Sequence, residues 1–70
     1  MYDYSKLRGR IVEKFGSMSA FADALGTSKV TVSLKMNNES GFTRENIIKW
    51  AELLEISEEE YAQYFFCKMT

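Results

Sequence analysis

The chain has 70 residues, of which 46% are hydrophobic and 27% charged, and its net charge is −1. This length allows one small domain, and the composition is that of an ordinary globular protein rather than a disordered or membrane-spanning one. No apolar run is long enough to span a membrane and no signal-peptide pattern opens the chain, so we expect a cytoplasmic protein. With no histidine and only one cysteine, Cys67, the usual zinc sites and catalytic pairs are missing, and we expect no enzyme, metal or cofactor.

Two amphipathic helices are predicted in the first part of the chain. Apolar residues at spacings of three and four predict a helix from Tyr4 to Phe15, with Asp3 as its N-cap and Gly16 as its stop. Ser17 is the expected cap of a second, short helix, and Gly26 suits the left-handed residue that ends it. The sequence thus begins as a helix pair with short connections.

The segment from Lys29 to Met36 is ambiguous. Its apolar residues alternate strictly, which alone predicts a strand. Ser28 before it is a good helix cap, however, and there is no second strand to pair with, so we predict a helix. In that helix Val32 and Met36 face the core, whereas Val30 and Leu34 form a second apolar stripe on nearly the opposite side, which predicts a partner that covers it.

Two further helices are predicted after residue 42. Thr43 caps one of them, which has a single apolar stripe up to Leu54. Ser57 and Glu60 form a capping box at the start of the last helix, and this explains the acidic triplet at 58–60 better than an acidic binding site does. No linker or repeat divides the chain, so we expect an all-α domain over residues 1–66 and a short, frayed tail over 67–70 with a free thiol.

The stretch from residue 18 to 38, MSAFADALGTSKVTVSLKMNN, resembles the helix-turn-helix of the lambda-repressor-like (XRE/Cro) family. The family pattern has a small residue, a glycine four positions later and a β-branched or leucine residue six further on, here Ala22, Gly26 and Val32. With the flanking YDYSKLRGRIVEKFG and EEEYAQYFF, the sequence is similar over nearly its whole length to small Cro-like or repressor-like proteins of temperate phages and prophages. The resemblance implies a compact five-helix lambda-repressor-like DNA-binding domain with the helix-turn-helix at its second and third helices.

The sequence also departs from the family pattern. Many members pair an arginine of the first helix with a glutamate near the end of the third, where this chain has Ile11 and Met36. We expect an apolar contact in place of that ion pair, since such a replacement costs little. Lys35 stands where members often have a large apolar residue, so Met36 is expected to supply that packing.

The resemblance implies a transcriptional regulator, most simply a repressor, that binds double-stranded operator DNA without a cofactor or small-molecule ligand. Its third helix would lie in the major groove and contact bases through Ser28, Lys29, Val30, Ser33 and Leu34. The expected contacts to the DNA backbone are Ser17, Met18, Thr31, Asn37, Asn38 and Arg44. The alternatives are that Val30 and Leu34 pack on the other helices and that Arg44 has no role.

A homodimer is expected because one helix-turn-helix reads few base pairs and the last ten residues hold more aromatic side chains than a small domain buries. The predicted dimer contacts are Tyr64, Phe65 and Phe66, and the alternative is that these residues pack onto their own chain. Two other functions stay open: an antitoxin-type regulator with the same fold, and a protein-interaction module that uses the Val30 and Leu34 stripe.

The net charge hides a polarity along the chain. Residues 1–41 carry six Lys or Arg and four Asp or Glu, whereas residues 42–70 carry three and six. The predicted helix-turn-helix half is therefore mildly basic, and the acidic excess lies in the last helices. This modest footprint predicts DNA binding that is readily lost in salt.

Overall fold

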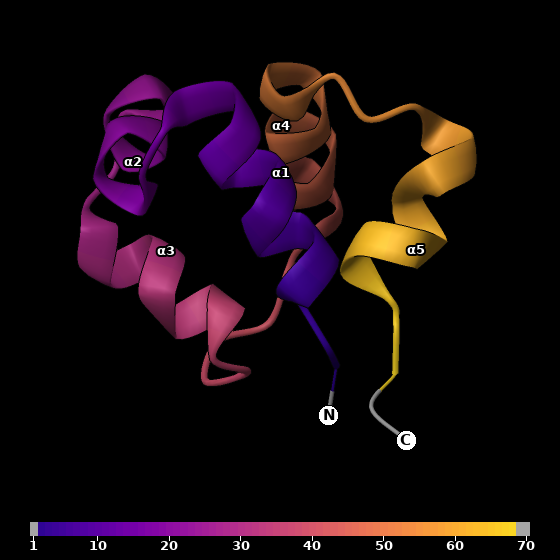
Figure 1. Cartoon of the computed structure of the whole chain (residues 1–70). Coiled ribbons are helices and arrows are strands. Elements are labelled where there is room, and N and C mark those ends of the chain that lie inside the picture. Colours follow the sequence, from indigo (N-terminus) through magenta and orange to yellow (C-terminus); the bar gives the residue numbers. More distant parts are fainter. Residues whose placement is uncertain (1, 69–70) are drawn as a thin grey trace.

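Three of the described helices begin at a residue whose side chain caps the first turn. The computed structural model describes residues 2–68 and contains α1 (Ser5–Phe15), α2 (Met18–Leu25), α3 (Lys29–Met36), α4 (Arg44–Leu54), a 3-10 turn η1 (Glu58–Glu60) and α5 (Tyr61–Phe65) (Figure 1). The hydroxyl groups of Ser17, Ser28 and Thr43 accept hydrogen bonds of 3.1–3.2 Å from the amide three residues later. The predicted five-helix, all-α fold is confirmed, and the ambiguous segment is helix α3.

Helix ends differ from the sequence prediction in two places. α1 begins one residue later than predicted, with Tyr4 as N-cap, and the Asp3 carboxylate instead accepts the amide of Ser5 at 2.9 Å. The hydrogen bonds from Ser5 lower the pKa of Asp3. The capping box of Ser57 and Glu60 is confirmed, but the first turn behind it is the 3-10 turn η1 rather than α-helix.

A series of aromatic rings runs through the core. Phe15, Phe21, Trp50, Phe42 and Phe65 form a continuous series with ring centroids 4.8–5.3 Å apart. Aliphatic side chains from α1, α3 and α4 fill the space around it. The core thus joins the predicted helix pair to α4 and α5 rather than forming two separate units.

The expected replacement of an ion pair by apolar side chains agrees with the burial. Ile11 of α1 and Met36 of α3 both lie in the same buried cluster. Arg10, the next residue on α1, donates to the backbone oxygens of Leu54 and Glu55 at 2.9 and 3.0 Å. Its guanidinium therefore closes the C-terminal end of α4, whose carbonyl groups lack helical partners.

The two ends of the described chain are joined. Tyr2 and Lys68 form an isolated antiparallel bridge, and the amide of Asp3 donates to the carbonyl of Cys67 at 2.6 Å. Of the predicted tail, residues 67 and 68 are therefore held by backbone contacts and not frayed, while 69 and 70 lie outside the described residues. The thiol of Cys67 is exposed and free.

Figure 1 places α3 and α5 at opposite sides of the molecule, with α1 crossing between them. α2 packs against both α1 and α3. The exposed side of α3 and the α5 region are therefore separate surfaces. Among the described residues, no helix is long and apolar enough to cross a membrane.

Candidate nucleic-acid interface

Helix α3 has one buried and one exposed apolar stripe. Val32 is fully buried and Met36 nearly so, whereas Val30 is 67% exposed and Leu34 39% exposed. The alternative that Val30 and Leu34 pack on the other helices is therefore not what the structure shows. A surface helix with large apolar residues directed to solvent has a face that suits a partner.

The first turn of α3 adds two polar groups to this face. Ser28 and Lys29 are both exposed, and within residues 2–68 Lys29 forms no ion pair. The Ser28 hydroxyl accepts the amide of Thr31 and lies 3.0 Å from its hydroxyl oxygen. The cap therefore occupies part of the hydrogen-bonding capacity of Ser28, while the ammonium group of Lys29 is free to donate.

On one side, α3 borders the start of α2 and a residue that the sequence did not single out. Ser33, Asn37, Met18 and Arg8 line a shallow hollow of about 180 Å³. Three of these four were predicted to contact DNA, and the fold brings them together. Arg8 is exposed on α1, and no local pattern marks it, because its nearness to α3 depends on how the helices pack.

On the other side, α3 faces α4 across a smaller hollow. Thr31, Lys35, Asn46 and Lys49 lie around it. Lys35 is engaged within the chain, since its ammonium group donates to the carbonyl of Gly41 at 3.0 Å and lies 5.6 Å from the ring centre of Phe42. Lys49 is exposed and is a second cation near α3 that sequence reasoning did not select.

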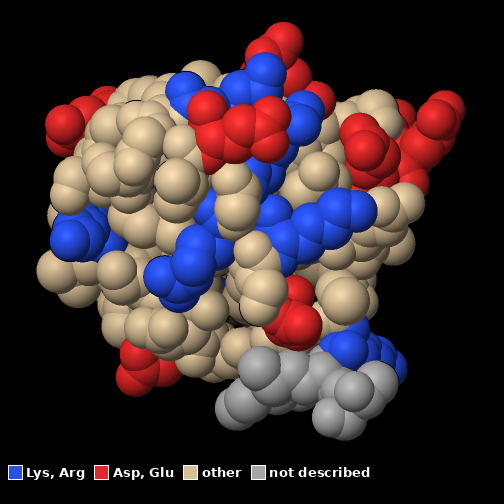
Figure 2. All heavy atoms as spheres, in the orientation of Figure 1, with Lys and Arg blue, Asp and Glu red and all other residues tan. Residues whose placement is uncertain are grey.

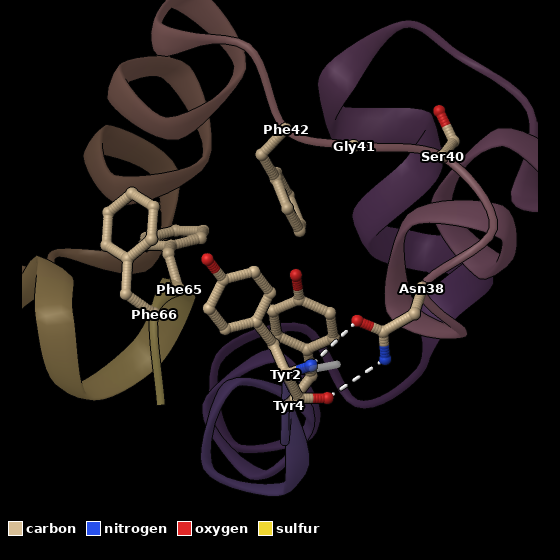
Figure 3. Close-up of a pocket in the computed structure, with 8 residues that line it drawn as sticks. All are labelled: Tyr2, Tyr4, Asn38, Ser40, Gly41, Phe42, Phe65 and Phe66. Atoms are coloured by element: carbon tan, nitrogen blue, oxygen red, sulfur yellow. Dashed lines mark hydrogen bonds between the residues drawn. The ribbon is translucent and has the colours of Figure 1, made fainter. Parts of the chain in front are cut away.

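Asn38 corrects one of the predicted backbone contacts. Its side-chain amide donates to the carbonyl of Tyr2 and accepts the amide of Tyr2, both at 2.9 Å (Figure 3). The residue has a left-handed φ of 61°, a conformation that asparagine tolerates better than most residues. Asn38 therefore holds the N-terminal segment, and its amide oxygen and one of its two N–H groups are engaged within the chain.

Arg44 is placed on a different surface from the other predicted backbone contacts. It is the first residue of α4 and lines a groove between α4 and α5, together with Glu58 and Phe66. Its part in DNA binding stays a prediction. A cation in the first turn opposes the helix dipole, so its neighbours in that groove matter for its role.

The predicted dimer contacts divide into buried and exposed residues. Tyr64 and Phe65 are 7% and 1% exposed, so they pack in the core of their own chain and the prediction of an interface role for them is wrong. The reason is that α5 has only five residues and turns its inner side to α1 and α4. Phe66 alone is accessible, with 48% exposure.

Basic side chains gather over α1, but most of them have partners (Figure 2). Lys6 donates to Gln63 at 2.6 Å, and Lys14 forms an ion pair of 2.5 Å with Glu55. The hydrogen bond and charge of Lys14 lower the pKa of Glu55. The cations that remain around α3 are therefore few: Lys29 at its start, Arg8 on one side and Lys49 on the other.

Comparison with known proteins gives the class of the chain. Residues 1–68 match the family described as "Protein of unknown function (DUF739)", and the chain belongs to this family. It is similar to the solved solution structure of the modulator of repression (MOR) of the temperate bacteriophage TP901-1 from Lactococcus lactis. The identity is 43%, over 93% of this chain and 88% of that chain, and the TM-score is 0.84. None of the curated proteins compared with the chain matches it significantly.

The likeness supports a regulatory role in a phage and agrees with the predicted fold. Membership of the lambda-repressor-like family, DNA binding and a homodimer stay predictions. The relative is named a modulator of repression, and its title says nothing of DNA.

Proposed function

We propose that this chain is a phage transcriptional regulator that binds operator DNA through the exposed side of α3. The observation that carries the proposal is the division of α3 into two apolar stripes, with Val30 and Leu34 left in solvent beside the free ammonium group of Lys29. A helix of this kind fits the major groove, where apolar side chains contact thymine methyl groups and lysine donates to guanine O6 or N7.

Contacts to phosphate would position the helix. Arg8 and Asn37 lie on one side of α3 near Met18, whose amide is at the start of α2, and Lys49 lies on the other side. Amides at a helix start and arginine side chains are common donors to DNA phosphates. With so few cations, we expect DNA affinity to fall as the salt concentration rises, but less steeply than for strongly basic domains.

A protein partner on the same surface is the second candidate function. It is favoured by the mainly apolar character of the stripe of Val30 and Leu34, which has one cation beside it, and by the overall charge of −1. Apolar residues at helical spacing are also the anchors by which helices bind protein grooves. In that case the chain would modulate repression by contact with another regulator rather than by occupying DNA.

The test is a selection of duplexes from a randomised pool, followed by anisotropy titrations of the selected and a scrambled duplex between 50 and 200 mM salt. A specific regulator discriminates by roughly a thousandfold and loses affinity with salt. Equal affinity for both duplexes at every salt concentration contradicts sequence-specific binding and favours the protein partner.

Variants locate the interface. Lys29→Ala should relax base preference by about 1–3 kcal/mol, whereas Arg8→Ala should weaken binding to all duplexes about equally. Val12→Ser is the matched control for changes of Val30, because Val12 is also an exposed valine, at 50%, but lies on α1. If Val30→Ser and Val12→Ser bind alike, α3 does not make the contact.

A further inference from the structure

The groove between α4 and α5 is a hollow that lies away from α3. Its volume is about 600 Å³, and its lining combines Ile47 and Ile48 of α4 with Tyr61 and Phe66 at α5, and with Phe42. Ile48 is 39% and Phe66 48% exposed, so the groove presents large apolar side chains to solvent. Exposed apolar surface of this kind marks an interaction site.

Phe66 also lines a second hollow. The second hollow, of about 480 Å³, lies between the N-terminal segment and α5 and is lined by Tyr2, Tyr4, Phe42 and Phe66 among others (Figure 3). The edge of the Phe66 ring meets Tyr2 with centroids 6.1 Å apart. A half-exposed aromatic residue therefore stands at the border of two hollows.

The groove also carries one charge of each sign. Arg44 and Glu58 both line it, both are exposed, and within residues 2–68 neither side chain forms an ion pair or hydrogen bond. By contrast, Lys6, Arg10 and Lys14 on α1 all have partners within the chain. The unpaired cation and anion leave the groove with charges that another surface can complement.

We propose that the groove between α4 and α5 binds a second copy of this chain around a two-fold axis. In such a contact each surface must complement itself, and this groove is lined by a half-exposed aromatic side chain, by a cation and by an anion. Phe66 of each copy enters the groove of the other, and Arg44 of each copy pairs with Glu58 of the other. This groove is distinct from the exposed side of α3. Dimerisation can therefore be measured without DNA, and its failure would not contradict the proposed function.

Sedimentation velocity of the full chain tests this, with a reductant present because the Cys67 thiol is exposed. We expect a dimer that dissociates on dilution, with a dissociation constant below about 1 mM. Phe66→Ser should raise that constant at least roughly tenfold, as the loss of a central aromatic anchor does. A chain that stays monomeric at 1 mM overturns the proposal.

Charge exchange tests the two-fold pairing. Arg44→Glu and Glu58→Arg each place like charges opposite one another twice per dimer, and each should raise the dissociation constant roughly tenfold. An equimolar mixture of the two variants should restore association, because both pairs are then again of opposite sign in the mixed dimer. The double variant should restore it as well.

The control is Val12→Ser, which removes an equally exposed apolar side chain from α1 and should leave the dissociation constant unchanged. Thermal unfolding of each variant shows that it is folded. If the mixture of charge variants stays monomeric, or if Leu34→Ser disrupts the dimer and Phe66→Ser does not, the contact lies elsewhere and the proposal is wrong.

Discussion

Helices α2 and α3 have the same length of eight residues and the same type of cap, a serine hydroxyl that accepts the amide three residues on, yet they place their apolar side chains differently. In α2 the large apolar residues Phe21 and Leu25 are buried. In α3 only half of the apolar residues are, and Val30 and Leu34 face solvent. The difference shows that the large apolar side chains of α2 are used for the core, whereas half of those in α3 contribute little to it and are exposed, as the proposed interface requires.

The largest effect is expected on the inner side of α2. Phe21→Ala removes a fully buried ring that stacks edge-on against Trp50 with centroids 4.8 Å apart. The loss of transfer free energy and the cavity that remains should lower the free energy of unfolding by about 3–5 kcal/mol, measured by urea denaturation. Phe66→Ala, which truncates a half-exposed ring, should cost clearly less, and equal losses would contradict the assigned core.

Two valines of α3 test its two sides directly. Val32→Ala removes two methyl groups from a fully buried site and should cost about 2 kcal/mol of folding stability. Val30→Ala, at 67% exposure, should change stability by less than about 0.5 kcal/mol and reduce binding to the partner instead. Unfolding curves and anisotropy titrations of both variants separate the two roles. A large loss of stability from Val30→Ala would show that this stripe belongs to the core.

The two serine caps should contribute equally to stability and unequally to binding. Ser17→Ala and Ser28→Ala each remove an acceptor for a first-turn amide, and each should cost about 1 kcal/mol in thermal or urea unfolding. Only Ser28 lies at the start of α3, so only Ser28→Ala should also change base preference in the duplex selection. If both variants bind DNA equally well and select the same duplexes, the start of α3 does not contribute more to base preference than the start of α2.

The smallest effect concerns the ion pair of Lys14 and Glu55, which lies outside both helices. Because Lys14 keeps the pKa of Glu55 lower in the folded chain than in the unfolded one, its contribution is present above the ordinary pKa of glutamate. It is lost as the pH falls through the lowered pKa. Glu55→Gln should therefore slightly destabilise the chain at pH 7 and have no effect at pH 2, by urea unfolding at both values. If Glu55→Gln lowered the free energy of unfolding more at pH 2 than at pH 7, the Glu55 carboxylate would not be stabilised by Lys14 in the folded chain.

Local signals made the helices predictable from the sequence. Ser17, Ser28 and Thr43 mark helix starts because a short hydroxyl side chain satisfies an amide of its own first turn. Gly26 marks the turn between α2 and α3, and its φ is 76° as predicted. The alternating segment needed context, because strict alternation fits a strand until no pairing partner is found.

Features that depend on distant contacts were not predictable. Asn38 was expected to face DNA, but it binds Tyr2, which is 36 positions away in the chain. Arg8 reaches the side of α3 only because α1 packs there, and nothing in its own neighbourhood indicates this. Likewise α5 is too short for its periodicity to separate the buried Phe65 from the exposed Phe66.

The joined ends of the chain have a consequence for hydrogen exchange. The amide of Asp3 donates to the carbonyl of Cys67, directly after Phe66, so its proton can exchange with solvent only when the N-terminal segment and the end of α5 separate. That one amide is therefore a reporter of local opening at the edge of the α4 and α5 groove. The exchange rate of the Asp3 amide should fall if a second copy covers the groove. This rate can be measured by NMR on the chain without any substitution.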